Sequence, residues 1–126
     1  MERRLISGHS PYEHVAGFSR AVIAGDRVHV AGTAPIPADG SPPPQGAYDQ
    51  AALCLSIIGE ALERAGSGLE HVVRTNIFIT DPAHWPDVSR AHGDVFRNVR
   101  PAATCVVSQL LDPAWVVEIE ADAVLP

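Results

Sequence analysis

Only two segments of this sequence have helical spacing, and they stand among five or six segments that have the character of β-strands. Within 47–65, apolar residues recur at helical intervals, at Ala51, Leu55, Ile58 and Leu62. Gly66 follows where a C-terminal cap is expected, and the second helix is predicted over 85–98. Two helices are too few to cover both faces of such a sheet. The sequence therefore predicts an α+β protein whose second sheet face is covered by another copy of the chain.

The remaining segments place the strands around these helices. Strands are predicted at 19–24, 27–32, 69–80, 102–109 and 115–124, with a sixth, short strand at 4–7. The pair Gly25-Asp26 predicts a hairpin turn between the first two of these. Residues 34–46 hold five of the eleven prolines and are expected to form a loop. No linker or repeat divides the chain, so residues 1–126 are interpreted as one domain.

Composition excludes several classes of function. The formal charge of −6 and nine scattered arginines argue against a nucleic-acid partner, and no apolar run is long enough to span a membrane. Six histidines without a metal-binding spacing, and glycines without a phosphate-binding pattern, predict neither a metal nor a cofactor. Cys54 and Cys105 lie in apolar stretches without a CxxC pattern, which favours buried thiols and a cytoplasmic location.

The last predicted strand alternates apolar and acidic residues, in VVEIEADAV (116–124). A period of two places Glu118, Glu120 and Asp122 on one face. On a face open to water, these would be ordinary solvated side chains. At a boundary between subunits, a desolvated glutamate could hold a proton near neutral pH and serve as a general acid or base. The residues alone leave both interpretations open.

Five stretches of the chain together carry a family resemblance. They are SRAVIAGDRVHVAGT (19–33), ALERAG (61–66), HVVRTNIFITD (71–81), RPAAT (100–104) and VVEIEADAV. In this order and spacing they resemble the reactive intermediate deaminase family, also called YjgF-like or Rid, from about residue 7 to residue 124. The resemblance implies a chorismate-mutase-like fold, in which two helices back a mixed sheet of five or six strands. It also implies a homotrimer with a central barrel and small-molecule clefts between its subunits.

The resemblance implies roles for individual residues as well. Glu118 matches a glutamate that positions the hydrolytic water and is the candidate catalytic residue. Gly32 matches a backbone contact to the ligand, and Cys105 matches a cysteine beside the cleft. Phe18 stands where deaminase members often have tyrosine, so a hydroxyl is absent there.

The chain departs from the family at the ligand-binding arginine. In deaminase members, an arginine in the segment after the proline binds the carboxylate of a 2-imino or 2-enamino acid, and here that position is Ala103, followed by Thr104. Alanine offers neither charge nor hydrogen-bond donors, so simple 2-imino acids are expected to bind poorly. Arg20 and Arg100 are the arginines that could replace the missing anchor.

Two classes of function follow from these residues. The first is a hydrolase or lyase that acts on imine, enamine or carbonyl metabolites at a cleft between subunits, with Glu118 handling water or a proton. The alternative is a non-catalytic trimer that binds a metabolite or a protein at the same cleft. An endoribonuclease role is a distant third, because the chain is acidic and lacks stacking aromatic residues.

Overall fold

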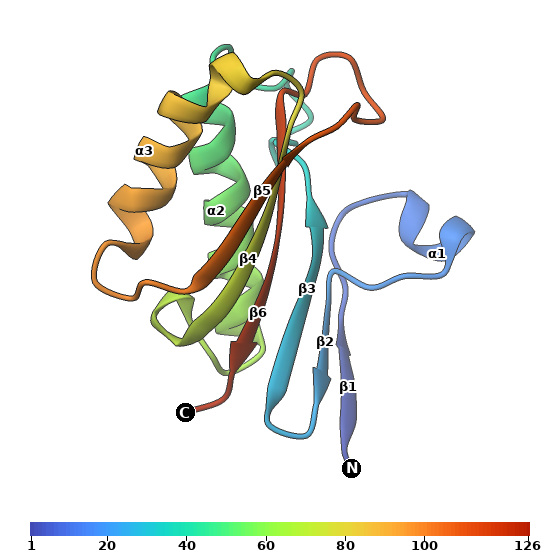
Figure 1. Cartoon of the computed structure of the whole chain (residues 1–126). Coiled ribbons are helices and arrows are strands. Elements are labelled where there is room, and N and C mark those ends of the chain that lie inside the picture. The colour runs from blue at the N-terminus through green and yellow to red at the C-terminus, as the bar shows by residue number, and fades with distance from the viewer.

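A six-stranded sheet is the frame of the protein in the computed structural model, which describes residues 1–126 (Figure 1). The strands are β1 (Arg3–Ile6), β2 (Ala21–Ala24), β3 (Arg27–Thr33), β4 (Val72–Ile79), β5 (Ala102–Val107) and β6 (Val117–Val124). Their spatial order is β1-β2-β3-β6-β4-β5. Only the β4–β5 pair is parallel, because α3 (Trp85–Phe96) connects the two as a crossover. The predicted α+β class with a mixed sheet is therefore confirmed.

Two helices back one face of this sheet. They are α2 (Ala47–Arg64) and α3, which pack against each other on the same side (Figure 1). The chain reverses after α2 because Gly66 adopts a φ of +89°, and the amides of Gly66 and Ser67 donate to the carbonyl groups of Glu63 and Leu62. No helix has both the length and the apolar composition required to cross a membrane.

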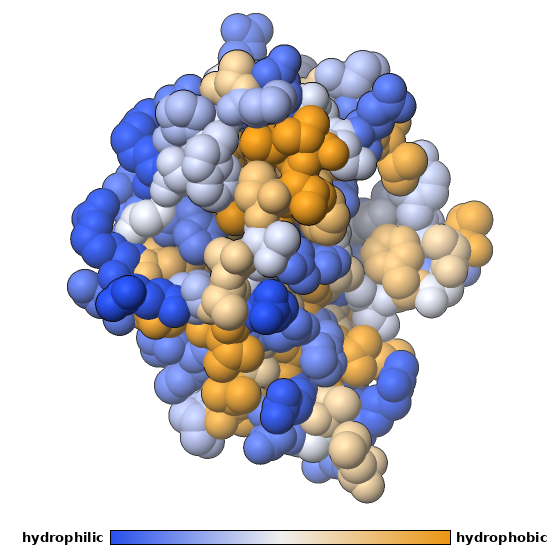
Figure 2. All heavy atoms as spheres, viewed as in Figure 1, coloured by the Kyte–Doolittle hydropathy of each residue, from blue (hydrophilic) through white to orange (hydrophobic).

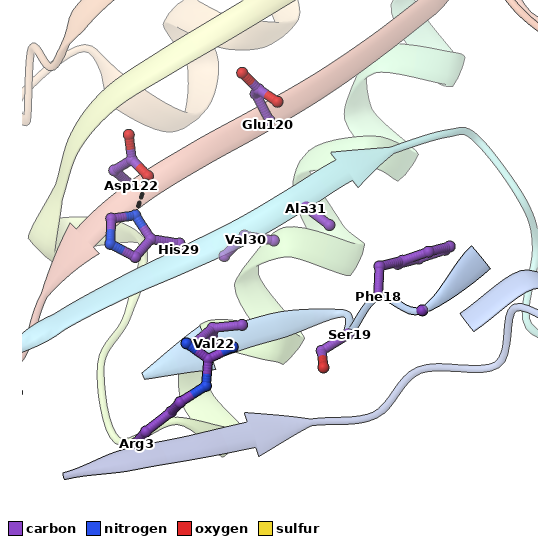
Figure 3. Close-up of a pocket in the computed structure, with 10 residues that line it drawn as sticks. Arg3, Phe18, Ser19, Val22, His29, Val30, Ala31, Glu120 and Asp122 are labelled. Atoms are coloured by element: carbon purple, nitrogen blue, oxygen red, sulfur yellow. Dashed lines mark hydrogen bonds and ion pairs between the residues drawn. The ribbon is translucent and has the colours of Figure 1, made fainter. Parts of the chain in front are cut away.

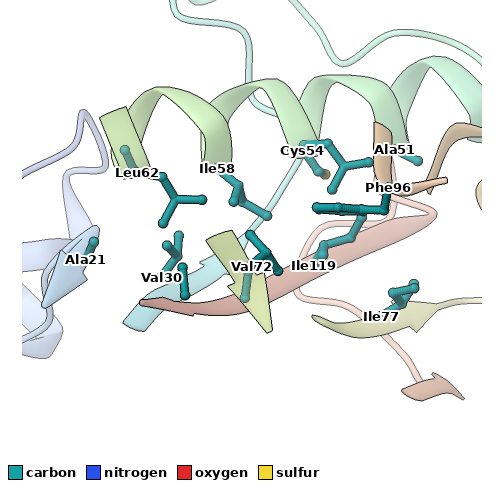
Figure 4. Packing of buried hydrophobic residues seen from close by; sticks show 14 of the residues in the cluster. Ala21, Val30, Ala51, Cys54, Ile58, Leu62, Val72, Ile77, Phe96 and Ile119 are labelled. Carbon is teal, nitrogen blue, oxygen red and sulfur yellow. The ribbon is translucent and has the colours of Figure 1, made fainter. Parts of the chain in front are cut away.

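The core lies between α2 and the sheet (Figure 4). The helix contributes Cys54, Ile58 and Leu62, whose side chains face Val30 and Ile119 on the strands. These five residues are almost completely buried, so they pack the helix against the middle of the sheet. The burial fixes the position of β6, the strand that carries Glu118.

The other sheet face carries polar side chains in the middle. The alternation predicted for β6 is confirmed, because Val117, Ile119, Ala121 and Ala123 are buried while Glu118 and its polar neighbours are partly exposed. Asp122 pairs with His29 on β3, and Glu120 pairs with Asn76 on β4. The central part of this face is thus able to bind polar ligands, and no helix of the chain packs on it in the way that α2 and α3 pack on the first.

Several local details differ from the prediction. β2 begins at Ala21, β5 ends at Val107 and β6 begins at Val117, each two residues inside the predicted range. Residues 69–71 form a 3-10 turn in place of the first part of a strand, because Leu69 packs against Gly59 of α2. The second helix ends at Phe96, two residues earlier than expected. A five-residue helix, α1 (Tyr12–Ala16), was not predicted and precedes β2.

Candidate active site around Glu118

Glu118 lies near the beginning of β6, opposite Phe78 of β4. It lines a hollow of about 260 Å³ together with Phe78, Glu120 and the loop at 108–111. The walls therefore combine an aromatic ring, two leucines, the hydroxyl of Ser108 and two carboxylates. Such a mixture of apolar wall and few polar groups suits a small organic ligand.

An irregularity in β3 brings the backbone close to this carboxylate. The pairing of β3 with β6 shifts register between Val30 and Thr33, which is a β-bulge or similar irregularity. At Gly32, within this segment, a Cβ atom would lie only 2.9 Å from Oε2 of Glu118. Because Gly32 has no side chain, the Glu118 carboxylate can lie against its backbone. The structure thus brings these two predicted site residues together.

Arg20 binds the same backbone segment through its guanidinium group. Its Nη2 donates hydrogen bonds to the carbonyl oxygens of Ala31, at 2.8 Å, and Gly32, at 2.7 Å. Its Nε is buried without a hydrogen-bond partner, and burial lowers the pKa of the guanidinium. Because Arg20 is held by the protein backbone, it is poorly placed to replace the missing ligand-binding arginine.

The carboxyl group of Glu118 has a perturbed proton affinity. Burial raises the pKa of Glu118, the charge of Arg20 lowers it, and the neighbouring charge of Glu120 raises it, with a net shift upward. Asn76 donates a hydrogen bond of 2.9 Å to Glu120 and keeps that second carboxylate in place. A carboxyl group with a raised pKa beside a hollow has the properties of a general acid or base.

The residues predicted on the far strand lie apart from Glu118 within one chain. β5 is separated from β6 by β4, which amounts to two strand spacings or roughly 10 Å. Thr104 pairs with Asn76 and so shares the face of Glu118, whereas Ala103 and Cys105 pair with Thr75 and Ile77 on the helix-covered face. The structure thus divides this predicted set between two faces.

Arg100 is far from the hollow. In register, Glu118 is level with Phe78 and Val106, and Arg100 precedes Val106 by about six residues, or roughly 20 Å of strand. Arg100 is exposed and has a φ of +57°, with its amide closing the end of α3 on the Phe96 carbonyl. It acts as a turn residue and cannot serve as an anchor for a ligand held by Glu118 of the same chain.

Phe18 lies in a second, larger hollow of about 420 Å³ on the same sheet face (Figure 3). This hollow also contains His29, whose Nδ1 lies 2.7 Å from Oδ1 of Asp122, and Arg3 of β1. Glu120 contributes to both hollows, so they adjoin along β6. Phe18 is therefore near the candidate site but not in the hollow that Glu118 lines.

Sequence reasoning missed Asn76 and Phe78 as parts of this site. Both alternate onto the face of Glu118, but their contribution depends on β4 lying beside β6, which the sequence pattern does not specify. Both cysteines are free thiols, but only Cys54 is buried as predicted, whereas Cys105, on the edge strand β5, is partly exposed. Desolvation raises the pKa of each thiol, which makes them weakly reactive. No three His, Cys, Asp or Glu side chains are grouped so that they could hold a metal ion.

Comparison with known proteins identifies the family. The family profile described as endoribonuclease L-PSP matches residues 8–125. An uncharacterized protein of Streptomyces coelicolor is 39% identical over 127 residues, which cover 96% of this chain and 90% of that protein. A Capra hircus protein named 2-iminobutanoate/2-iminopropanoate deaminase is 29% identical over 123 residues, which cover 97% of this chain and 90% of that protein.

The fold comparison agrees with the sequence comparison. A Mycobacterium tuberculosis protein, whose crystal structure is described as that of a member of the YjgF/YER057c/UK114 family, has a TM-score of 0.90 and 37% identity to this chain. The match covers 98% of this chain and 100% of the other. On these matches of sequence and fold, the chain belongs to the YjgF-like, or Rid, family.

Proposed function

We propose that this protein is a hydrolase or lyase of the deaminase type, which acts on small imine, enamine or carbonyl compounds at Glu118. The observation that supports this most directly is the half-buried Glu118 carboxyl group, with its raised pKa, at the wall of a partly apolar hollow. The deaminase name of the Capra hircus relative supports the same class of reaction.

The proposed chemistry needs one group that can both accept and return a proton. In imine hydrolysis, the oxygen of water bonds to the imine carbon and the carbon–nitrogen bond breaks, which yields a carbonyl compound and ammonia. Glu118 as a carboxylate accepts a proton from the water, and as a carboxylic acid it returns the proton to the departing nitrogen. The raised pKa of Glu118 brings both protonation states closer to neutral pH.

The preferred substrate in this proposal carries no carboxylate. The hollow is lined by Glu118 and Glu120 and by no basic side chain, so an anionic ligand would be repelled. Ala103 supplies no charge, Arg20 is bound to backbone carbonyl groups, and Arg100 is remote from Glu118 of its own chain. A neutral or cationic compound with an apolar substituent fits these walls best.

In this proposal, the site lies at a boundary between the copies of a homotrimer with a central barrel. β5 is an edge strand, and Val106, Val107 and the following Leu111 expose apolar side chains. Figure 2 shows apolar residues gathered over the upper end of β5 and the loop that follows it. A second copy packed against this edge would cover these side chains and would close the hollow beside Glu118.

Two imines that differ in a carboxylate test the proposal. An amino-acid oxidase converts leucine to an imine with a carboxylate, and an amine oxidase converts 3-methylbutylamine to an imine with the same alkyl group and no carboxylate. We expect the protein to accelerate carbonyl release from the second imine and to leave the first near its spontaneous rate. The Ala103→Arg variant is the matched change. Because Ala103 lies away from Glu118 of its own chain, the new arginine would act at the Glu118 hollow of a neighbouring copy in the proposed trimer, and the variant should gain activity on the leucine-derived imine.

Two other results would contradict the proposed substrate class or the proposed activity. Strong acceleration of the leucine-derived imine by the unmodified protein would show that another group binds the carboxylate and would contradict the proposed substrate class. Acceleration of neither imine, together with calorimetric binding of a small carbonyl compound, would favour the non-catalytic binding module.

A further inference from the structure

Arg20 is influenced by the charges of two acidic residues from different parts of the fold, Glu13 of α1 and Glu118 of β6. Glu13 is only 8% exposed and is the one buried acidic residue of the chain. Both oxygens of Glu13 accept a hydrogen bond from the amide of Gly8, at 2.9 and 3.2 Å. A Cβ atom on Gly8 would lie 2.8 Å from Glu13 Oε2 and 3.1 Å from Arg20 Cδ, so both side chains pack against this glycine.

Arg20 also binds the segment of β3 that contacts the Glu118 carboxylate. The two hydrogen bonds from Nη2 fix the carbonyl groups of Ala31 and Gly32, and the amide of Ala31 donates in turn to the carbonyl of Arg20 at 3.0 Å. Thr33, which is completely buried, donates its hydroxyl to the same Ala31 carbonyl at 2.8 Å. The irregular segment of β3 is therefore held from both sides, with Gly32 facing the Glu118 carboxylate.

We propose that Arg20 is the positioning residue of the site: its two hydrogen bonds hold the Gly32 segment against Glu118, and its side chain packs beside Glu13 at Gly8. The inference rests on the proposed function only in calling the Glu118 hollow a reaction site. The segment before β2, including α1, would then help to hold the site together. Arg20 does not contact the reacting atoms in this account.

The charges around Arg20 and Glu118 determine in which direction Arg20 shifts the pKa of Glu118. Arg20 is influenced by Glu13 from α1, by Glu118 from β6 and by Cys54 from α2, and Glu118 is influenced by Arg20 and Glu120. Burial raises the pKa of the Cys54 thiol, so Cys54 contributes no charge at neutral pH. Arg20 is thus the only cation that opposes the effects of burial and of Glu120 on Glu118. Its removal should make Glu118 retain a proton to higher pH.

The test follows the titration of the Glu118 carboxyl carbon by NMR, with the resonance assigned from its loss in Glu118→Gln. In Arg20→Gln, we expect the titration midpoint of Glu118 to move to higher pH than in the unmodified protein. Arg20→Lys keeps the charge, so its titration midpoint should lie between those of Arg20→Gln and the unmodified protein. Arg27→Gln, which removes an exposed arginine at the hairpin turn, is the matched control and should leave the midpoint unchanged.

A second measurement needs no change at Arg20 and so remains valid if Arg20→Gln fails to fold. In the unmodified protein, the Nε resonance of Arg20 should shift with the same midpoint as Glu118, and this shift should vanish in Glu118→Gln. An Arg20 signal that stays constant while Glu118 titrates, or an unchanged Glu118 midpoint in folded Arg20→Gln, would overturn the inference. Neither readout involves turnover, so failure of the proposed function would be seen separately.

Discussion

The properties of Glu118 arise from a few neighbouring residues. Gly32 leaves room for its carboxylate, and burial beside Phe78 and the 108–111 loop raises its pKa. Because a raised pKa means that the folded protein favours the protonated form, this contribution to stability is present at low pH and is lost as the pH rises through the folded-state pKa. The protein therefore gives up some stability near neutral pH to keep an ionisable group in the hollow.

Gly32→Ala tests this view at a single position. The new Cβ would meet the tip of a flexible side chain, so we expect the free energy of unfolding to change by less than about 1 kcal/mol while the Glu118 carboxylate is displaced. Carbonyl release from the imine without a carboxylate should fall at least about tenfold, since proton transfer depends on the position of the carboxylate.

Gly93→Ala in α3 is the matched control for this variant, because nothing lies within 4 Å of the new methyl group. Its turnover should equal that of the unmodified protein. If Gly32→Ala also keeps full turnover, the close contact between Gly32 and Glu118 has no functional role.

At the level of helices and strands, the sequence predicts those segments whose own residues carry a clear periodic pattern. α2 was predicted because its apolar residues follow a helical period and a glycine ends it, and β6 because acidic and apolar residues alternate along it. α1 was missed because five residues are too few for a periodic signal, and its packing depends on Glu13 bonding to the amide of Gly8.

The candidate site was predictable only in part for a related reason. The period of two placed Glu118 on the polar face, and the family resemblance selected it. The insertion of β6 between β3 and β4 brings in Asn76 and Phe78, and the role of Arg20 depends on hydrogen bonds to residues eleven and twelve positions away. Such pairings are set by the tertiary fold, so no local pattern reveals them.

The packing of α2 on the sheet determines where β6 lies, and Ile58→Ala tests its contribution. Ile58 is completely buried, so the loss of its side chain should lower the free energy of unfolding by about 2–5 kcal/mol. Ile57→Ala changes the same residue type at the next, partly exposed position of the helix and should cost clearly less. Denaturant unfolding at one fixed protein concentration measures both, and equal losses would contradict the assignment of the core face.

At the level of the whole molecule, the fold leaves one sheet face and the apolar β5 edge without cover. α2 and α3 occupy the first face, while the second presents the hollows beside Glu118 and Phe18. In the proposed homotrimer, neighbouring copies cover the β5 edge and complete the walls of the Glu118 hollow. Assembly and chemistry would then depend on the same surface, although Glu118 itself contributes the reacting group.

The most direct test of the central claim compares Glu118→Gln with the unmodified protein for turnover and for molar mass. Glutamine keeps the shape of the side chain but cannot exchange a proton near neutral pH. We expect carbonyl release from the imine without a carboxylate to fall to the spontaneous rate. Light scattering should still give about three times the chain mass of 13.4 kDa for both proteins. A trimeric glutamine variant that turns over this imine at the unmodified rate would contradict the account.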